Sequence, residues 1–213
     1  PADREQAVRA VLQQVVKDHK RILFNGDGYD DAWHAEAATR GLPNLSTSVD
    51  ALAALNTKAN AELFKKHKVL SNPELDSRTT IFFEKYCKQL LIEAETMVSL
   101  VRTQVLPAAL RHQTETIEAL AATEAVDLET PELREEVEQL VEMVRTCQSR
   151  LAALEATLGV PHDTTAPTQH AQYLRDTVIP AMADLREAAD ELELHIADDL
   201  WPLPKYQEML IVK

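Results

Sequence analysis

The residues of this chain that could do chemistry are few and poorly spaced for it. The short glycine pair Gly26-x-Gly28 lacks the third glycine of a dinucleotide fingerprint, and no GxxxxGK phosphate loop occurs in the sequence. His34 and Glu36 stand two residues apart, which directs them to different faces of a helix. The sequence therefore predicts neither a nucleotide-binding loop nor a histidine–carboxylate metal pair here.

Glutamate-rich helices also raise the hypothesis of a di-iron bundle, which requires Glu-x-x-His pairs on facing helices. At that spacing, the helical histidines His112 and His195 are preceded by Ala109 and Leu192, so the ligands are missing. Spacing suggests no Cys-His or Ser-His pair either. The sequence therefore predicts no catalytic, cofactor-binding or metal-binding residue in this chain.

The cysteines and the N-terminus bear on the cellular compartment. Cys87 and Cys147 belong to no CxxC pair and lie within helical patterns, so we expect them to be small buried hydrophobic residues. The N-terminus lacks a secretory pattern, and no apolar run reaches the roughly 20 residues that a membrane span needs. We expect a cytoplasmic protein. The chain opens with Pro1 and not with Met, which we interpret as a sign of a fragment of a longer protein.

Composition favours a helical, soluble domain of one large or two small parts. The 213 residues are 45% hydrophobic and 27% charged, close to the globular average. Four glycines and ten aromatic residues are too few for an all-β sandwich or barrel. The net charge of −13 opposes phosphate backbones and anionic lipids, so we expect no nucleic-acid partner and no membrane partner.

Residues 1–70 are expected to form a region of short helices. Three of the four glycines and most of the aromatic residues lie in or near it. Asp30 or Asp31 is expected to cap one helix, and Gly41 to end it. The expected helices cover approximately residues 2–19, 31–40, 49–55 and 58–66.

Residues 71–200 are expected to form long helices. Ser71, Pro73 and Glu74 form a strong start signal for a helix of about 50 residues. Pro107 lies inside this helix and should kink it near residues 103–106. Its apolar stripe contains Phe83, Tyr86, Leu90, Ala94, Met97, Val101, Val105 and Ala108.

A second long helix begins at Pro131 and has a strict heptad seam. The seam contains Leu133, Val137, Leu140, Val144, Cys147, Leu151, Leu154 and Leu158. A third long helix, kinked at Pro180, is expected to end at residues 198–200. Such helices cannot bury their seams alone, so the fold class is all-α, with long, proline-kinked antiparallel helices in a helical hairpin or three-helix bundle.

The two helices with predicted kinks contain similar short sequences. Residues 102–108 read RTQVLPA, and residues 175–181 read RDTVIPA. One interpretation is chance similarity between amphipathic helices. The other is that two matching kinks let neighbouring helices bend together around a shared surface.

Charge is distributed unevenly along the chain. Residues 113–158 contain eleven acidic and three basic residues, whereas residues 57–90 contain seven basic and four acidic ones. The acidic segment is either a solvated hairpin end or a protruding arm that meets another subunit or a partner.

Residues 201–213 are expected to form an extended C-terminal tail, because Pro202 and Pro204 disfavour helix. We expect Trp201, Leu203 and Tyr206 to dock on the aromatic region around Phe24, Tyr29 and Trp33. The alternative is a frayed terminus. 

Three segments are distinctive in combination. They are KRILFNGDGYDDAWHAEAATRGLPN (20–44), IEAETMVSLVRTQVLPAALR (92–111) and DDLWPLPKYQEML (198–210). The first resembles the region that follows the catalytic domain in type III glutamine synthetases. The second is similar to that family's first long C-terminal helix, and the third to its C-terminal end. Their order and spacing also fit, and the resemblance covers essentially the whole chain.

The resemblance implies a large cytosolic enzyme that joins ammonia to the γ-carboxylate of glutamate. The family uses ATP, through a γ-glutamyl phosphate, with Mg²⁺ or Mn²⁺ in the site, and assembles similarly to stacked hexameric rings. The residues that hold metal and nucleotide belong to the upstream catalytic domain, so the resemblance places no cofactor on this chain. The implied partners are that domain and neighbouring subunits of a homo-oligomer.

Three interpretations remain open from the sequence. The chain is the non-catalytic C-terminal region of a type III glutamine synthetase that serves assembly or stability, or it is a freestanding helical interaction module. A small bundle enzyme with its own metal is disfavoured by the missing ligand pairs.

Overall fold

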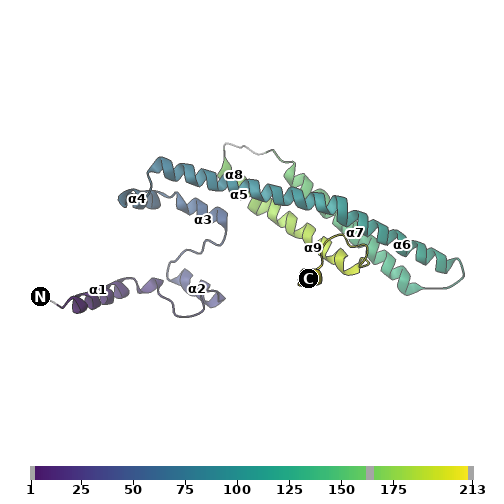
Figure 1. Cartoon of the computed structure of the whole chain (residues 1–213), viewed down its shortest axis with the longest axis horizontal. Coiled ribbons are helices and arrows are strands. Elements are labelled where there is room, and N and C mark those ends of the chain that lie inside the picture. Colours follow the sequence, from purple (N-terminus) through teal and green to yellow (C-terminus); the bar gives the residue numbers. More distant parts are fainter. Residues whose placement is uncertain (1–2, 162–165, 211–213) are drawn as a thin grey trace. The chain divides into compact units, whose positions relative to one another are not determined.

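The computed structural model describes residues 3–161 and 166–210, apart from the side chains of Tyr206 and Gln207. Within these ranges the chain forms helices, turns and loops and no strand, which confirms the predicted all-α class (Figure 1). By their internal contacts the residues fall into two compact units, 1–51 and 52–213. A domain boundary near residue 70, where short helices give way to long ones, stays our proposal.

The first unit contains short helices with clear polar caps. It comprises α1 (Arg4–Asp18), the 3₁₀ turn η1 (Lys20–Ile22) and α2 (Asp31–Thr39), and α3 (Ser48–Leu55) crosses into the second unit. The carboxylate of Asp3 caps α1, and the Oδ1 atom of Asp30 accepts a hydrogen bond of 3.0 Å from the Ala32 amide at the start of α2. Asp30 is thus the cap of α2, and Asp31 is its first residue.

An aromatic pair joins the segment that follows η1 to α2. The rings of Phe24 and Trp33 stack with centroids 4.2 Å apart, and the guanidinium of Arg40 lies 5.3 Å from the centre of the Trp33 ring. Arg40 also donates a hydrogen bond of 2.7 Å to the Leu23 carbonyl. A Cβ atom on Gly26 would lie 2.4 Å from the Phe24 ring, so a larger residue here would displace that ring.

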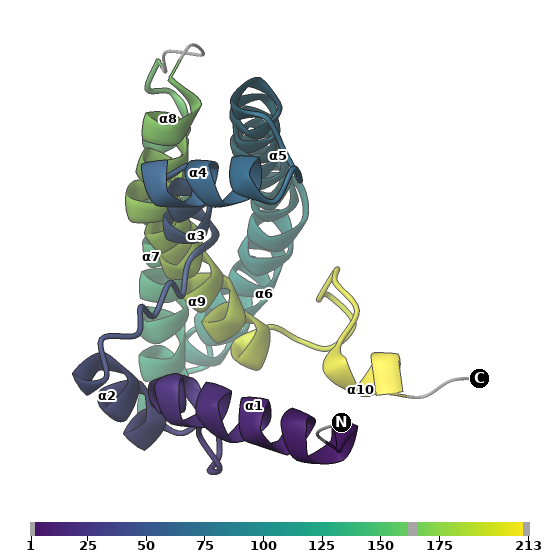
Figure 2. The ribbon, with the colours of Figure 1, turned by 90° about the vertical axis from the view of Figure 1, so that its left-hand side faces the viewer.

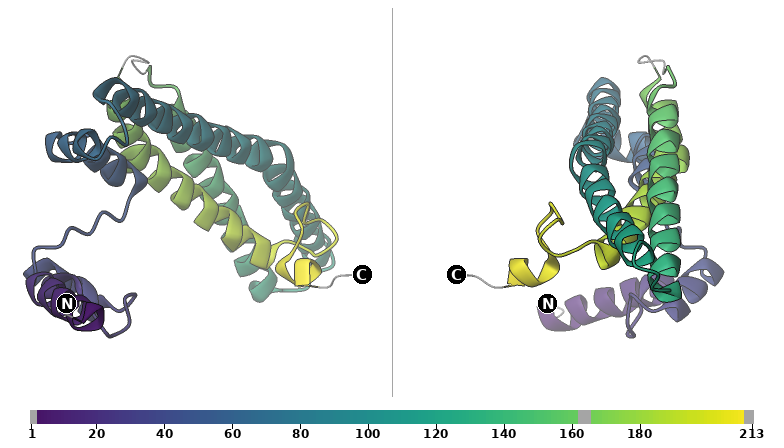
Figure 3. Two further views of the ribbon diagram at one scale, coloured as in Figure 1. Left: turned by 60° about the vertical axis from the view of Figure 1, so that its left-hand side comes forward. Right: turned by 90° about the vertical axis from the view of Figure 1, so that its right-hand side faces the viewer.

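The second unit contains the end of α3, then α4 (Lys58–Lys66), and continues into a long helical rod. A capping box starts the rod: the backbone amide and the hydroxyl of Ser71 donate hydrogen bonds of 2.8 and 2.7 Å to the Glu74 carboxylate. The rod consists of α5 (Asn72–Leu100), a π-helical segment η2 (Val101–Val105) and α6 (Leu106–Glu124). In the left view of Figure 3 it curves along its length.

Pro107 and Pro180, the prolines of the two similar sequences, each follow a π-helical segment. The Leu106 amide donates to the Val101 carbonyl, five residues back, and the Ile179 amide donates to the Leu174 carbonyl in the same way. The second segment, η3 (Leu174–Val178), joins α8 (Pro167–Tyr173) to α9 (Ile179–His195). Because proline lacks an amide donor and crowds the preceding turn, the helix opens by one residue and does not end. The two similar sequences therefore also share a local structure, a π-helical segment just before the proline.

The predicted heptad seam forms the centre of the second unit. On α7 (Pro131–Leu158), five of its eight residues are buried and the other three are half-buried. The buried members are Leu140, Val144, Cys147, Leu151 and Leu154. α7 packs against both α6 and α9, as Figures 2 and 3 show.

Polar contacts give the direction of these helices. Arg102 in η2 forms an ion pair with Glu155 of α7, and the Tyr173 hydroxyl donates a hydrogen bond of 3.0 Å to the Thr157 carbonyl. Further along, Arg150 and Asp184 are joined at 3.1 Å. In these contacts, later residues of α7 lie beside earlier residues of the neighbouring helices. α7 therefore runs antiparallel to both neighbours. The two π-helical segments also lie opposite the same end of α7.

The C-terminal part differs in two details from the sequence expectation. α9 ends at His195, earlier than residues 198–200, because the buried Ile196 adopts an extended backbone. The last segment is not extended throughout, since α10 (Tyr206–Leu210) follows Lys205. The Glu208 carboxylate accepts a hydrogen bond of 3.1 Å from the Lys205 amide, which supports the start of that short helix.

Candidate functional site

The residues considered first for chemistry lie apart from one another. The Nδ1 atom of His34 lies 3.3 Å from the Nδ2 atom of Asn44, whereas Glu36 pairs with Arg40. His195 lies 3.8 Å from Glu191, which precedes it by one helical turn. Among residues 3–161 and 166–210, no group of three or more His, Cys, Asp or Glu side chains could hold a metal ion.

Both cysteines are free and buried, as the sequence predicted. Burial raises the pKa of the Cys87 thiol, whose sulfur lies 3.8 Å from the Pro167 carbonyl oxygen. Burial also raises the pKa of Cys147 to about 11. Both thiols are therefore protonated at neutral pH and suit packing better than nucleophilic chemistry.

A groove of about 550 Å³ lies between α5–η2 and α9, beside the segment that follows α9. The buried Trp201 lines it, and its indole Nε1 makes no hydrogen bond within the described residues. The apolar lining comprises Ile92, Met97, Leu100, Val101, Val105, Met182, Ala189, Trp201, Leu203 and Pro204. An ion pair between Lys205 and Asp198 anchors the same segment.

The groove corrects the predicted docking site of Trp201. We expected the region around Phe24, Tyr29 and Trp33, but Phe24 and Trp33 stack on each other and Tyr29 is exposed. Trp201 is buried, as expected, but among the residues of α5, η2 and α9. The sequence predicted that the Trp201 side chain is buried, but it did not predict which helices bury it.

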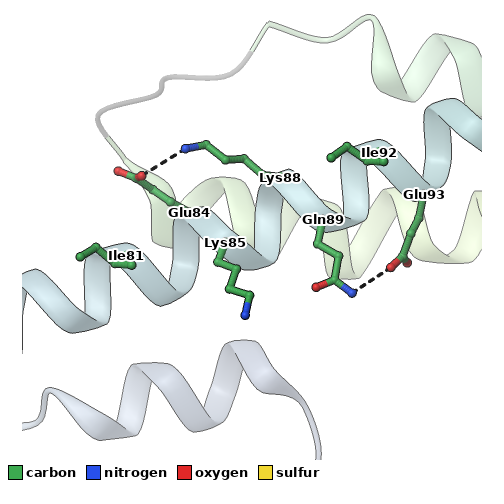
Figure 4. A pocket seen from close by; sticks show the side chains of 7 residues that line it. All are labelled: Ile81, Glu84, Lys85, Lys88, Gln89, Ile92 and Glu93. Carbon is green, nitrogen blue, oxygen red and sulfur yellow. Dashed lines mark hydrogen bonds and ion pairs between the residues drawn. The ribbon is translucent and has the colours of Figure 1, made fainter.

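A second surface, here called the α5 face, is the outer side of α5. Ile81 and Ile92 are 56% and 63% exposed although both are large aliphatic residues. Lys88 lies 3.5 Å from Glu84, and Lys85 forms no ion pair within the described part of the chain. In Figure 4 the two lysines extend to opposite edges of this face. It comprises the apolar and basic residues Arg78, Ile81, Phe82, Lys85, Lys88 and Ile92 together with the acidic residues Glu74, Glu84 and Glu93.

The acidic segment predicted from the charge pattern ends in a compact turn. This turn with its flanking helix ends, residues 124–134, is here called the acidic tip. Val126 and Leu128 are 64% and 58% exposed there, and Asp127 adopts a positive φ of 58°. An ion pair between Arg134 and Glu124 joins the two helix ends. The tip thus combines acidic side chains with exposed aliphatic ones.

Of these surfaces, the sequence indicated the acidic tip but missed the α5 face. The sequence did contain evidence for this face. Ile81 and Ile92 do not belong to the apolar stripe of α5, so they lie on a different side of the helix. The excess of basic residues over residues 57–90 belongs to the segment as a whole and does not indicate which side of a helix carries it.

Comparison with known proteins adds to the resemblance. Residues 7–124 match the family model described as the glutamine synthetase C-terminal domain. The chain is 33% identical to the type-3 glutamine synthetase of Dictyostelium discoideum, with 100% of the chain aligned, and 29% identical to the glutamine synthetase of Butyrivibrio fibrisolvens, with 97% aligned. It is 26% identical to the glutamine synthetase of Bacteroides fragilis (strain YCH46), with 99% aligned.

The chain spans about 30% of the length of each of these relatives. No helix in the described part of the chain is long and apolar enough to cross a membrane.

Proposed function

Because this chain belongs to the family of glutamine synthetase C-terminal domains, we propose that it is the C-terminal helical region of a type III glutamine synthetase. The whole protein would be a cytoplasmic, ATP-dependent glutamate–ammonia ligase. The observation that carries the proposal is the alignment of 97–100% of the chain with three glutamine synthetases. That similarity favours this function over a freestanding interaction module.

The proposed role of this region is assembly or stability, with the chemistry located upstream. ATP and Mg²⁺ or Mn²⁺ would serve the whole enzyme, but the residues of this chain that the structure describes do not fit these groups. The turn at Gly26 and Gly28 has no phosphate-loop pattern, and the described residues hold no cluster of metal ligands. We therefore assign no step of the reaction to this chain.

The surfaces of the chain support an assembly role. Helix α1 has no buried residue, and its exposed aliphatic side chains are Val8, Val11, Leu12, Val15 and Val16. An aliphatic helix face of this kind requires cover, because exposed apolar patches on stable proteins mark interaction sites. We assign the upstream catalytic domain as the partner of α1, with neighbouring subunits contacting the long helices.

The test compares the intact protein with this chain alone. The intact protein should form glutamine and phosphate from glutamate, ammonia and ATP when Mg²⁺ or Mn²⁺ is present. The chain alone should show strong helical circular dichroism and no turnover in the same assay. Absence of glutamine formation by the intact protein would contradict the proposed enzyme, and robust turnover by the chain alone would contradict the non-catalytic role.

A further inference from the structure

The loop between η1 and α2 contains the one Asn–Gly pair of the sequence, Asn25 followed by Gly26. An asparagine side chain cyclises when the backbone nitrogen of the next residue attacks its carbonyl carbon, Cγ. Glycine in the next position favours this attack, because it has no Cβ to crowd the nitrogen and its backbone reaches more conformations. By its neighbour, Asn25 is therefore the most reactive of the five asparagines.

Both reacting groups of this pair are free within the described part of the chain. Asn25 and Gly26 are exposed and belong to no helix. Neither the side-chain amide of Asn25 nor the backbone amide of Gly26 forms a hydrogen bond with the described residues. The turn is held only after the pair, where the Asp27 carboxylate accepts a hydrogen bond of 2.9 Å from the Tyr29 amide. The Gly26 nitrogen can therefore approach Cγ of Asn25 without breaking a hydrogen bond.

Asn56 and Asn60, by contrast, are held at both reacting groups. The Nδ2 atom of Asn56 donates a hydrogen bond of 2.7 Å to the Asp76 carboxylate. The Nδ2 atom of Asn60 donates one of 2.7 Å to the Ala54 carbonyl. The backbone nitrogens of the residues that follow, which would have to attack, donate hydrogen bonds of 3.4 and 2.9 Å to backbone carbonyls. Cyclisation at either position would break existing hydrogen bonds.

The remaining two asparagines are hindered in other ways. The Nδ2 atom of Asn44 lies 3.3 Å from the Nδ1 atom of His34, and a bulky leucine follows Asn44 in the sequence. Asn72 is followed by Pro73, whose nitrogen carries no hydrogen and cannot close the ring. Among the asparagines that the structure describes, Asn25 alone combines a free side-chain amide, a free backbone nitrogen and a glycine neighbour.

We propose that Asn25 is a site of spontaneous deamidation in the folded protein, an inference that does not depend on the proposed function. The Gly26 nitrogen forms a bond to Cγ of Asn25 and loses its proton to the departing amide. The bond between Cγ and Nδ2 breaks, and ammonia leaves. Water then opens the succinimide ring: cleavage of the new bond to Cγ gives aspartate, and cleavage of the original peptide bond gives isoaspartate. Oxygen from water thus replaces the amide nitrogen, and no oxidant or metal is required.

The products differ from asparagine in charge and in backbone length. Either product adds a carboxylate to residues 25–31, which already contain three aspartates, so the net charge of this segment changes from −3 to −4. Isoaspartate also inserts one more carbon into the backbone beside Phe24, whose ring stacks on Trp33. The modification therefore acts next to the aromatic pair that joins this loop to α2.

Isotope labelling of the intact protein tests the proposal directly. The protein is incubated in H₂¹⁸O at mildly alkaline pH, its folding is followed by circular dichroism, and it is then digested with trypsin in ordinary water. Trypsin releases residues 22–40 as one peptide, in which Asn25 carries the only side-chain amide. Conversion in the folded protein inserts ¹⁸O, whereas conversion during digestion inserts ordinary oxygen. Fragment ions in the mass spectrum separate residue 25 from Asp27, which also precedes a glycine.

The other asparagines of the same digest provide internal controls. Residue 25 should convert at least about tenfold faster than Asn44, Asn56 and Asn60, which corresponds to about 1.4 kcal/mol of activation free energy. Asn25→Gln should remove the labelled 22–40 peptide, because the longer side chain moves the carbonyl carbon away from the Gly26 nitrogen. Asn72→Gln, at an exposed position that cannot cyclise, should leave the conversion at residue 25 unchanged.

Three results would overturn the proposal. The first is conversion at residue 25 that is no faster than at the three internal controls. The second is labelled conversion that appears only after the circular dichroism signal of the folded protein is lost. The third is the absence of labelled conversion in the intact protein, because the Asn–Gly pair would then be protected by another part of that protein.

Discussion

The first unit and the long helices of the second unit bury their apolar residues very differently. Helix α1 of the first unit has an aliphatic side but no buried residue, whereas α7 buries five seam residues. Both helices alternate apolar and polar residues, so their composition does not explain the difference. α7 has neighbours of comparable length in the same chain, α6 and α9, and contacts both. Amphipathicity thus predicts that a helix needs a partner, but not whether the partner belongs to the same chain.

The largest expected effect comes from removing a central side chain of the seam. Leu154 is fully buried, so Leu154→Ala should lower the free energy of unfolding by about 2–5 kcal/mol through lost burial and the resulting cavity. Leu194 is 79% exposed on α9 and provides the matched control, with an expected change within about 0.5 kcal/mol. Denaturant unfolding followed by circular dichroism measures both, and equal effects would show that α7 does not hold the core.

The next effect concerns the C-terminal segment. Truncation after Leu200 removes Trp201 and Leu203 from their groove, and burying a large apolar side chain contributes about 1.5–3 kcal/mol. The melting temperature should therefore fall by several degrees, at roughly 2–4 °C for each kcal/mol.

A fluorescence measurement checks the same dock independently. In a Trp33→Phe background the chain retains Trp201 as its single tryptophan, so the emission reports this site alone. Blue-shifted emission is expected because the indole is buried. An unchanged melting curve with emission typical of water would indicate a frayed terminus.

A smaller effect on stability is expected in the first unit. Val11→Asp with Val15→Asp places two carboxylates on the exposed side of α1, where each native side chain is about half exposed. The unfolding free energy of the chain should change by no more than about 0.5 kcal/mol for each substitution. In the intact protein, the same pair should weaken packing on the upstream domain and lower the melting temperature. An equal loss of stability in the isolated chain and in the intact protein would show that α1 packs within the chain itself.

The sequence predicted the parts of the fold that local chemistry determines. Ser71 and Glu74 supply reciprocal hydrogen-bonding groups, so the start of α5 followed from residue types alone. The seam of α7 followed from its regular spacing, because one side of a straight helix must be buried as a unit.

The remaining features depend on contacts that spacing does not encode. Pro107 and Pro180 predicted kinks, but whether a proline breaks a helix or inserts a π-helical turn depends on the packing around it. The end of α9 came early because Ile196 is buried in an extended conformation. The position of Trp201 depends on a groove that joins residues of α9, such as Met182, to residues about a hundred positions away, such as Met97.

The smallest expected effect is pH-dependent and lies at the start of α5. Hydrogen bonds from the Ser71 backbone amide, and secondarily from its hydroxyl, lower the pKa of Glu74 below that of an ordinary glutamate. A lowered folded-state pKa means that the carboxylate stabilises the fold above the unfolded-state pKa, roughly pH 4–5, and that this contribution is lost as the pH falls through the folded-state value.

Glu74→Gln should therefore lower the melting temperature slightly at neutral pH, and its difference from the natural sequence should shrink on acidification. Ser71→Ala removes the hydroxyl donor but keeps the backbone donor, which is the larger cause of the shift. This variant should accordingly retain most of the pH dependence, although its helix start is weaker. Thermal melts of both variants across the acidic range provide the measurement. If Ser71→Ala abolished the pH dependence completely, the hydroxyl and not the amide would be the principal donor to Glu74.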